Sequence, residues 1–264
     1  MIQHPAGYVV EISHFMQHSI VLKEGDWVEV GTLIGACGNS GYSPQPHIHV
    51  HVQQGQQLGA TTVPFEWENI ISMNELQFFS LPKEGRLVRP FVYDVAYDQM
   101  TVFSLDDKLS FSVTNGQDTK TIDVVVRMAI DGTFYFDSGD AKCYFGKQSQ
   151  QFVIYHCEGK NPVFDILEMT CSRIPLGYQS GLSWEDKIPR NMFKSQWQKG
   201  LNSIGKLISH RYVHQTKQNT FVAERVFSGE INNNGQVQSF KVEMDPILKF
   251  KKITCGKLEM VRNV

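Results

Sequence analysis

The stretch Pro46-His47-Ile48-His49-Val50-His51-Val52 alternates between polar and apolar residues without a break after its proline. Neighbouring residues of a strand point to opposite faces, so the alternation predicts a strand with His47, His49 and His51 on one face. His47 and His49 then lie about 6.5–7 Å apart at the backbone. In zinc hydrolases, three protein groups and a water bind the metal while a nearby group moves protons, and paired imidazoles suit both tasks. A His-x-His pair alone is weak support, because many such histidines simply lie on the surface.

The residues before this stretch read as short strands separated by turns. Tyr8–Ile12 is rich in β-branched residues, and Ile12-Ser13-His14-Phe15 follows it directly. Glycine-bearing turns then occur at Gly25-Asp26-Trp27-Val28, around Gly31–Gly35 and at Gly38-Asn39-Ser40-Gly41. Alternating apolar runs with glycine turns between them favour an all-β region.

This order of motifs resembles the lysostaphin-type (LytM-like) zinc metallopeptidases, and the match is collinear over about residues 4–53. Members of that family are β-rich endopeptidases that cut peptide cross-bridges in bacterial peptidoglycan. The resemblance implies that His49 is a zinc ligand, and that His47 and His14 are non-ligand histidines that stabilise the transition state or move a proton. It also implies a peptidoglycan peptide as partner and a place in the cell envelope. Biotinyl and lipoyl carrier domains share the Gly-Asp turn, but Lys23 is in the wrong place for a carrier lysine.

Two zinc ligands of the family are missing from the expected place. They belong to a His-x-x-x-Asp element before the position of His14, and residues 1–13 contain no such element. We therefore expect a partial domain, the C-terminal half of the family's domain, with an incomplete zinc site and little or no peptidase activity. The chain is then the tail of a longer protein or a product of truncation. His51 occupies a position where the family usually has a carboxylate or another polar residue, and we expect it to be a bystander.

Two further readings stay open at this point. The first is a non-catalytic module, derived from such a peptidase, that binds or regulates in the envelope or cell wall. The second is an all-β protein that binds carbohydrate or envelope material and whose histidines are incidental.

Composition and charge exclude some functions and divide the chain. The 264 residues carry a formal net charge of −2, so nucleic acid is not an expected partner. No apolar run of about 18 residues is present, which predicts no transmembrane segment, and the first thirty residues do not read as a secretory signal. Residues 1–70 contain one basic and six acidic residues, whereas the rest of the chain is net positive. Six of the nine histidines also fall in the first 51 residues, which predicts two modules.

The five cysteines are widely spaced and form no Cys-x-x-Cys pair, so a thiolate zinc site is not expected. Their number is odd, so at least one thiol is free or pairs with another chain. Cys143 and Cys157 are candidates for a bridge between neighbouring strands.

The remainder of the chain is expected to be β-rich. Alternating runs such as Lys108–Thr114, Thr121–Met128 and Gln151–His156, separated by turn signals, predict a sandwich-like region. One packed helix is predicted near 190–210, where apolar residues recur every three or four positions. The predicted fold is therefore mostly β. Its parts are a partial lysostaphin-like antiparallel domain (1–60), a connector (61–85) and a β-rich accessory domain (86–264).

Overall fold

A computed structural model describes residues 1–186, 215–233 and 236–264. The chain forms two compact units, Met1–Glu66 and Trp67–Val264. In the described ranges, none of the helices combines the length and the apolar character needed to cross a bilayer.

The N-terminal unit is built on a small antiparallel sheet with strands in the order β1-β2-β3-β4. The strands are β1 (Ile2–Gln3), β2 (Tyr8–Ser13), β3 (His49–Gln54) and β4 (Thr62–Val63). The central pair is β2 with β3, in a register that sets Tyr8 opposite Gln54 and Ser13 opposite His49. The long segment between β2 and β3 folds back on itself through isolated bridges, which pair Phe15 with Cys37 and Gly38 with His47.

The second unit is one continuous sheet, which has 15 strands among the described residues. Their order in space is β13-β12-β11-β10-β9-β8-β19-β18-β17-β16-β15-β14-β6-β5-β7, and all neighbours are antiparallel except β14 with β6. The strands are β5 (Trp67–Ser72), β6 (Glu75–Ser80), β7 (Val88–Pro90), β8 (Lys108–Asn115), β9 (Asp118–Met128), β10 (Phe134–Asp137), β11 (Lys142–Gln148), β12 (Gln151–Glu158), β13 (Arg173–Pro175), β14 (Ser183–Asp186), β15 (Gln215–Ala223), β16 (Val226–Asn233), β17 (Gln236–Asp245), β18 (Lys249–Cys255) and β19 (Leu258–Arg262).

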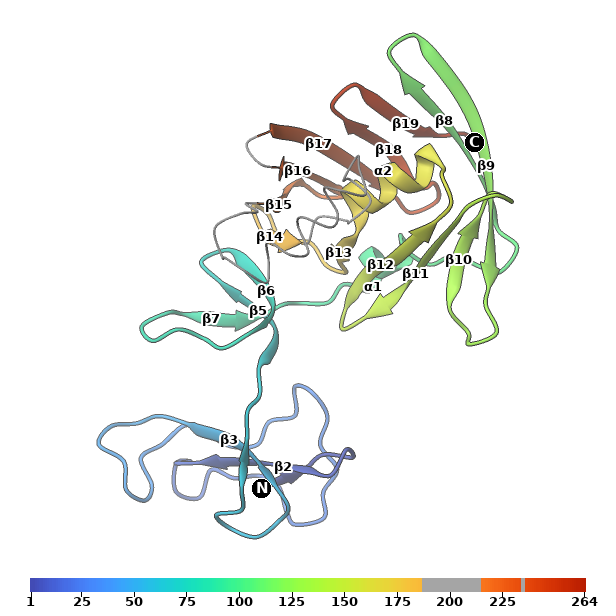
Figure 1. Cartoon of the computed structure of the whole chain (residues 1–264). Helices are drawn as coiled ribbons and strands as arrows, with labels where there is room; N and C mark the ends of the chain where they lie inside the picture. The colour runs from blue at the N-terminus through green and yellow to red at the C-terminus, as the bar shows by residue number, and fades with distance from the viewer. Residues whose placement is uncertain (187–214, 234–235) are drawn as a thin grey trace, which may run out of the picture. The chain divides into compact units, whose positions relative to one another are not determined.

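Two helices accompany this sheet in the described residues, α1 (Val95–Gln99) and α2 (Pro162–Cys171). The start of α2 is set by Asn161, whose side chain accepts a hydrogen bond from the amide of Val163 at 2.9 Å, and by Pro162 in the first turn. Helix α2 contacts β12, near one end of the strand order, and also β8, β17 and β18, which lie at least four places further along. The sheet must therefore curve around α2, as Figure 1 shows.

The hydrophobic core lies in the second unit and is rich in aromatic side chains. Trp184 is fully buried, with ring centroids of Phe221 at 4.9 Å and Phe227 at 5.4 Å. Near β10, the ring centroid of Phe103 lies 5.0 Å from that of Phe136, and the two rings meet edge-on. Tilted and edge-on ring pairs of this kind add to the stabilisation that burial of apolar area provides.

The prediction of a mostly β chain is confirmed. The three alternating runs named above, Lys108–Thr114, Thr121–Met128 and Gln151–His156, lie in β8, β9 and β12. The helix predicted near 190–210 falls outside the described residues. The segment 61–85, expected to connect two domains, carries β5 and β6 of the second unit's sheet. Cys143 and Cys157 lie directly opposite each other on β11 and β12, and both are free thiols in this structure.

A buried ion pair between β14 and β15 is hydrogen-bonded to Ser172, the residue that caps the C-terminal end of α2. Lys217 is fully buried, and its Nζ donates to Ser172 Oγ at 2.6 Å and lies 3.5 Å from Asp186 Oδ2. Ser172 Oγ in turn donates to Asp186 Oδ2 at 2.7 Å. Burial lowers the pKa of Lys217, while the Asp186 carboxylate acts in the opposite direction. The Asp186 carboxylate therefore stabilises the charged form of Lys217 at this buried position.

Asp186→Ala is expected to destabilise the second unit by about 3–5 kcal/mol, because it leaves the Lys217 ammonium buried without its carboxylate. Urea unfolding followed by tryptophan fluorescence measures this loss. The control is Glu224→Ala, which removes an exposed partner of Arg225 and should change the free energy of unfolding by less than about 1 kcal/mol. Equal, small effects of both substitutions would show that the buried pair does not support the fold.

Candidate functional site

Three histidines from two segments of the chain come together in the N-terminal unit: His14 from one segment, and His47 and His49 from the other. His14 directly follows β2, and His49 begins β3, so the Ser13–His49 pairing places them beside each other. His47 reaches the same place through Gly38, whose amide donates to His14 O at 2.9 Å and whose carbonyl accepts from the amide of His47 at 3.1 Å. Backbone hydrogen bonds therefore position all three side chains.

The distances between the rings define one cluster, called here the histidine cluster (His14, His47 and His49). The ring centroid of His14 lies 4.6 Å from that of His47 and 6.2 Å from that of His49. His14 has φ of 68°, a left-handed conformation that is uncommon for a residue with a side chain. Such backbone strain persists only where the surroundings hold it, and functional sites are where it tends to gather.

Hydrogen bonds fix the tautomers of two members of the cluster. His14 Nδ1 lies 2.7 Å from the carbonyl oxygen of Ser40, and His47 Nδ1 lies 2.8 Å from that of Gln45. A carbonyl oxygen only accepts, so both Nδ1 atoms carry hydrogen. In the neutral rings of His14 and His47, Nε2 therefore holds the lone pair and can accept a proton or a hydrogen bond from a bound molecule.

The loop from Gly38 to Gly41 passes so close to the segment after β2 that it needs glycine. A Cβ placed on Gly38 would lie 2.3 Å from the amide nitrogen of Met16. Gly41 has φ of 75°, and its Cβ position lies 3.8 Å from His14 Nδ1. The first glycine permits the close approach and the second permits the turn beside the histidine cluster.

A further polar chain, formed by His51, Glu11 and Gln53, continues from His49 along one face of β3. Nε2 of His49 lies 3.1 Å from Nδ1 of His51, whose own Nε2 lies 3.1 Å from Oε1 of Gln53 and 3.6 Å from Oε2 of Glu11. That His51 is a bystander in the chemistry stays a prediction; in the structure its ring contacts His49, Gln53 and Glu11. The same alternation that groups His49 with His51 also extends to Gln53, and this was the signal available in the sequence.

The zinc ion that the resemblance implies can be tested against the side chains that are present. A catalytic zinc site takes three protein ligands and a water. Over the ranges that the structure describes, no group of three or more His, Cys, Asp and Glu side chains is arranged to hold a metal ion. The donor set of the described residues thus does not fit a complete catalytic zinc site.

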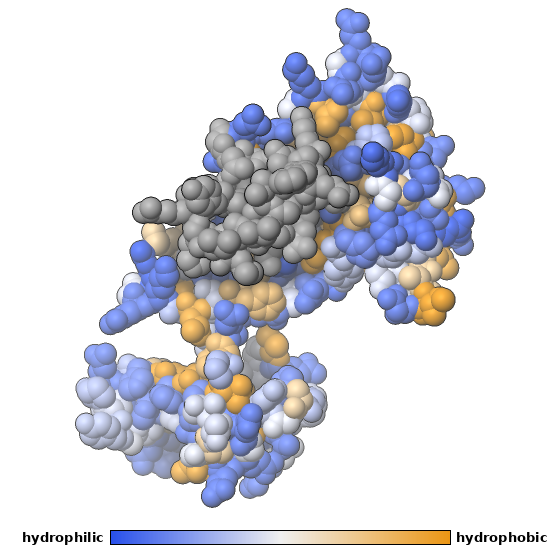
Figure 2. All heavy atoms as spheres, viewed as in Figure 1, coloured by the Kyte–Doolittle hydropathy of each residue, from blue (hydrophilic) through white to orange (hydrophobic). Residues whose placement is uncertain are grey.

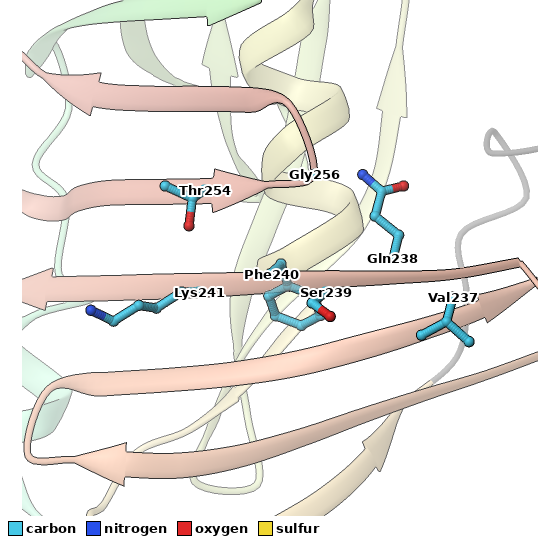
Figure 3. A pocket seen from close by; sticks show the side chains of 7 residues that line it. All are labelled: Val237, Gln238, Ser239, Phe240, Lys241, Thr254 and Gly256. Carbon is cyan, nitrogen blue, oxygen red and sulfur yellow. The ribbon is translucent and has the colours of Figure 1, made fainter.

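Two hollows on the surface of the described residues, one in each unit, are not lined by the histidine cluster. A groove of about 380 Å³ in the N-terminal unit is mainly apolar, with Ile12, Phe15, Leu33 and Ile48 among its lining residues. A hollow of about 440 Å³ on β17 and β18 has one charged lining residue, Lys241 (Figure 3). Figure 2 shows apolar residues interspersed with hydrophilic ones on the visible face of the N-terminal unit. The histidine cluster is therefore the candidate for chemistry.

Gly38→Ala is expected to disrupt the histidine cluster, because its new methyl group would displace Met16 and with it the bridge to His47. Histidine ring signals in NMR spectra of the full chain would then shift for His14 and His47. Val30→Ala is the control, since Val30 also lies in a turn of this unit and its side chain is fully exposed. Unchanged ring signals in Gly38→Ala would contradict the close approach.

One comparison with known proteins gives a match. The family model described as Peptidase family M23 matches residues 1–61. No curated protein and no solved structure matches the chain. The matched residues lie within the N-terminal unit and include the whole histidine cluster. The expected resemblance to LytM-like peptidases is thereby confirmed for this part of the chain: residues 1–61 are similar to peptidase family M23.

Proposed function

We propose that the N-terminal unit recognises peptides of the M23 substrate class, the peptide cross-bridges of bacterial peptidoglycan, at the histidine cluster. The supporting observation is that His14, which follows β2, meets His47 and His49 from around the start of β3 in one cluster, although more than thirty residues separate the two segments. The proposed place of action is the cell envelope, where this substrate occurs.

The histidine cluster has the chemistry that a peptide needs. The Nε2 lone pairs of His14 and His47 accept hydrogen bonds from peptide N–H groups, and each ring, once protonated, donates to a peptide carbonyl. In a peptidase the same two states move a proton and stabilise an oxyanion. His14 and His47 are thus proposed as the substrate-facing groups.

We further propose that the 264 residues alone have little or no peptidase activity. His49 is the zinc ligand in the family resemblance, yet the described residues supply no set of three donors around it. A single histidine does not hold a catalytic zinc ion tightly. Peptide recognition without efficient cleavage is therefore the function that this geometry supports best.

Binding of a synthetic cross-bridge peptide, measured by calorimetry on the full chain, tests the proposal. His47→Ala should weaken binding about tenfold, because a hydrogen-bonding group at the peptide is lost. His156→Ala, which changes an exposed histidine of the second unit, should leave the affinity unchanged. Equal affinities for His47→Ala and the unsubstituted chain, or no binding at all, would overturn the proposal.

The same samples show whether the chain cleaves the peptide. With zinc added, we expect no cleavage products by mass spectrometry over the period in which binding is measured. Cleavage that His49→Ala abolishes would contradict the proposed lack of activity and would identify the chain as a zinc endopeptidase.

A further inference from the structure

The polar chain on β3 starts from a buried amide. Gln53 is fully buried, and its Nε2 donates to the carbonyl oxygens of Gly55 and Gln57, both at 2.9 Å. Both hydrogens of the amide group are used by these two bonds, so the orientation of the side chain is fixed. Oε1 of Gln53, which has no hydrogen to give, can therefore only accept.

The next group, His51, takes its tautomer from its acceptors. Its Nε2 lies 3.1 Å from Gln53 Oε1 and 3.6 Å from a carboxylate oxygen of Glu11. The carboxylate is held in place by Ser13, whose hydroxyl donates to its other oxygen at 3.0 Å. Facing two acceptors, Nε2 of His51 carries hydrogen, and the Nδ1 atom of the neutral ring keeps the lone pair.

That lone pair determines the state of His49. His51 Nδ1 lies 3.1 Å from His49 Nε2, and the two rings meet edge-on with an angle of 71° between their planes. Because Nδ1 of His51 accepts, Nε2 of His49 must donate. The lone pair of His49 is then on Nδ1, the reverse of the arrangement in His14 and His47.

We propose that Gln53 and His51 are positioning residues that hold His49 in the tautomer with hydrogen on Nε2. We call the hydrogen bonds from Gln53 through His51 to His49 the relay. The relevance of the relay to peptide recognition rests on the proposed function, but the relay itself rests on the contacts of β3. The histidine cluster then offers unlike ring nitrogens: Nε2 of His14 and His47, and Nδ1 of His49. Any ligand that needs the lone pair of His49 has to approach from the Nδ1 side.

The shared face of β3 explains why these three residues act together. His49, His51 and Gln53 are spaced two apart, so their side chains line one side of the strand. Exposure falls along the series, from an exposed His49 through a half-buried His51 to a fully buried Gln53. The buried end fixes the orientation that the exposed end presents, as outer-shell partners do for functional histidines elsewhere.

Nitrogen-15 NMR of the histidine-labelled full chain tests this relay directly. The sample is treated with a chelator to remove metal and kept at pH about 8.5, well above the ordinary imidazole pKa of about 6.5. Both His49 and His51 should show hydrogen on Nε2 and an unprotonated Nδ1. Hydrogen on Nδ1 of His49 in the unsubstituted chain would overturn the proposal.

Two substitutions at one position separate positioning from mere packing. His51→Phe keeps an aromatic ring but removes the acceptor, and should shift the tautomer ratio of His49 toward the Nδ1–H form by roughly fivefold. His51→Gln keeps an acceptor oxygen and should restore most of the original ratio. An unchanged His49 spectrum in His51→Phe contradicts the relay, and so does an equal shift in both variants. His156→Phe serves as the control, because it removes an exposed histidine of the second unit.

The outcome is independent of the proposed function, because neither peptide nor metal is present. Locked tautomers in a chain that binds no peptide would mean that the relay stands and the peptide proposal fails. Mixed tautomers of His49 in a chain that binds the peptide through His47 would mean that the relay fails and the peptide proposal stands. If His51→Phe does not fold, the tautomers of the unsubstituted chain still decide the question.

Discussion

The antiparallel pairing of β2 with β3 is the constraint on which the candidate site depends. It joins the end of one strand to the start of the other, so that Ser13 lies opposite His49 and His14 follows immediately. A slip of one residue would turn the His49, His51 and Gln53 side chains to the other face of the sheet. This register also places His51 opposite Glu11, and the two side chains approach to 3.6 Å.

The two units are stabilised in different ways. The second unit has a large aromatic and aliphatic core around α2, whereas Val9 is the one fully buried apolar side chain in residues 1–66, all of which the structure describes. The N-terminal unit therefore depends more on strand pairing, turns and polar contacts than on burial of apolar area. Substitutions that break those contacts should affect its site more than substitutions of its apolar residues do.

Much of the site was predictable from sequence because its signals are local. Strict alternation predicted the shared face of His49 and His51, and the order of the glycine turns supported the family that the match over residues 1–61 confirms. The meeting of His14 with His47 was not predictable from spacing, because it depends on a loop that returns over more than thirty residues and on a left-handed backbone at His14. Helix α2 was not predicted, although its capping signal, Asn161 followed by Pro162, is present in the sequence.

Zinc affinity of the purified chain, measured by competition with a chelating dye, tests the central claim most directly. The claim is that the histidine cluster recognises peptides without being a complete zinc site. It predicts weak zinc binding that His49→Ala leaves essentially unchanged. One tightly bound zinc ion per chain, lost in His49→Ala, would contradict it and would show that this chain assembles a full set of ligands around His49.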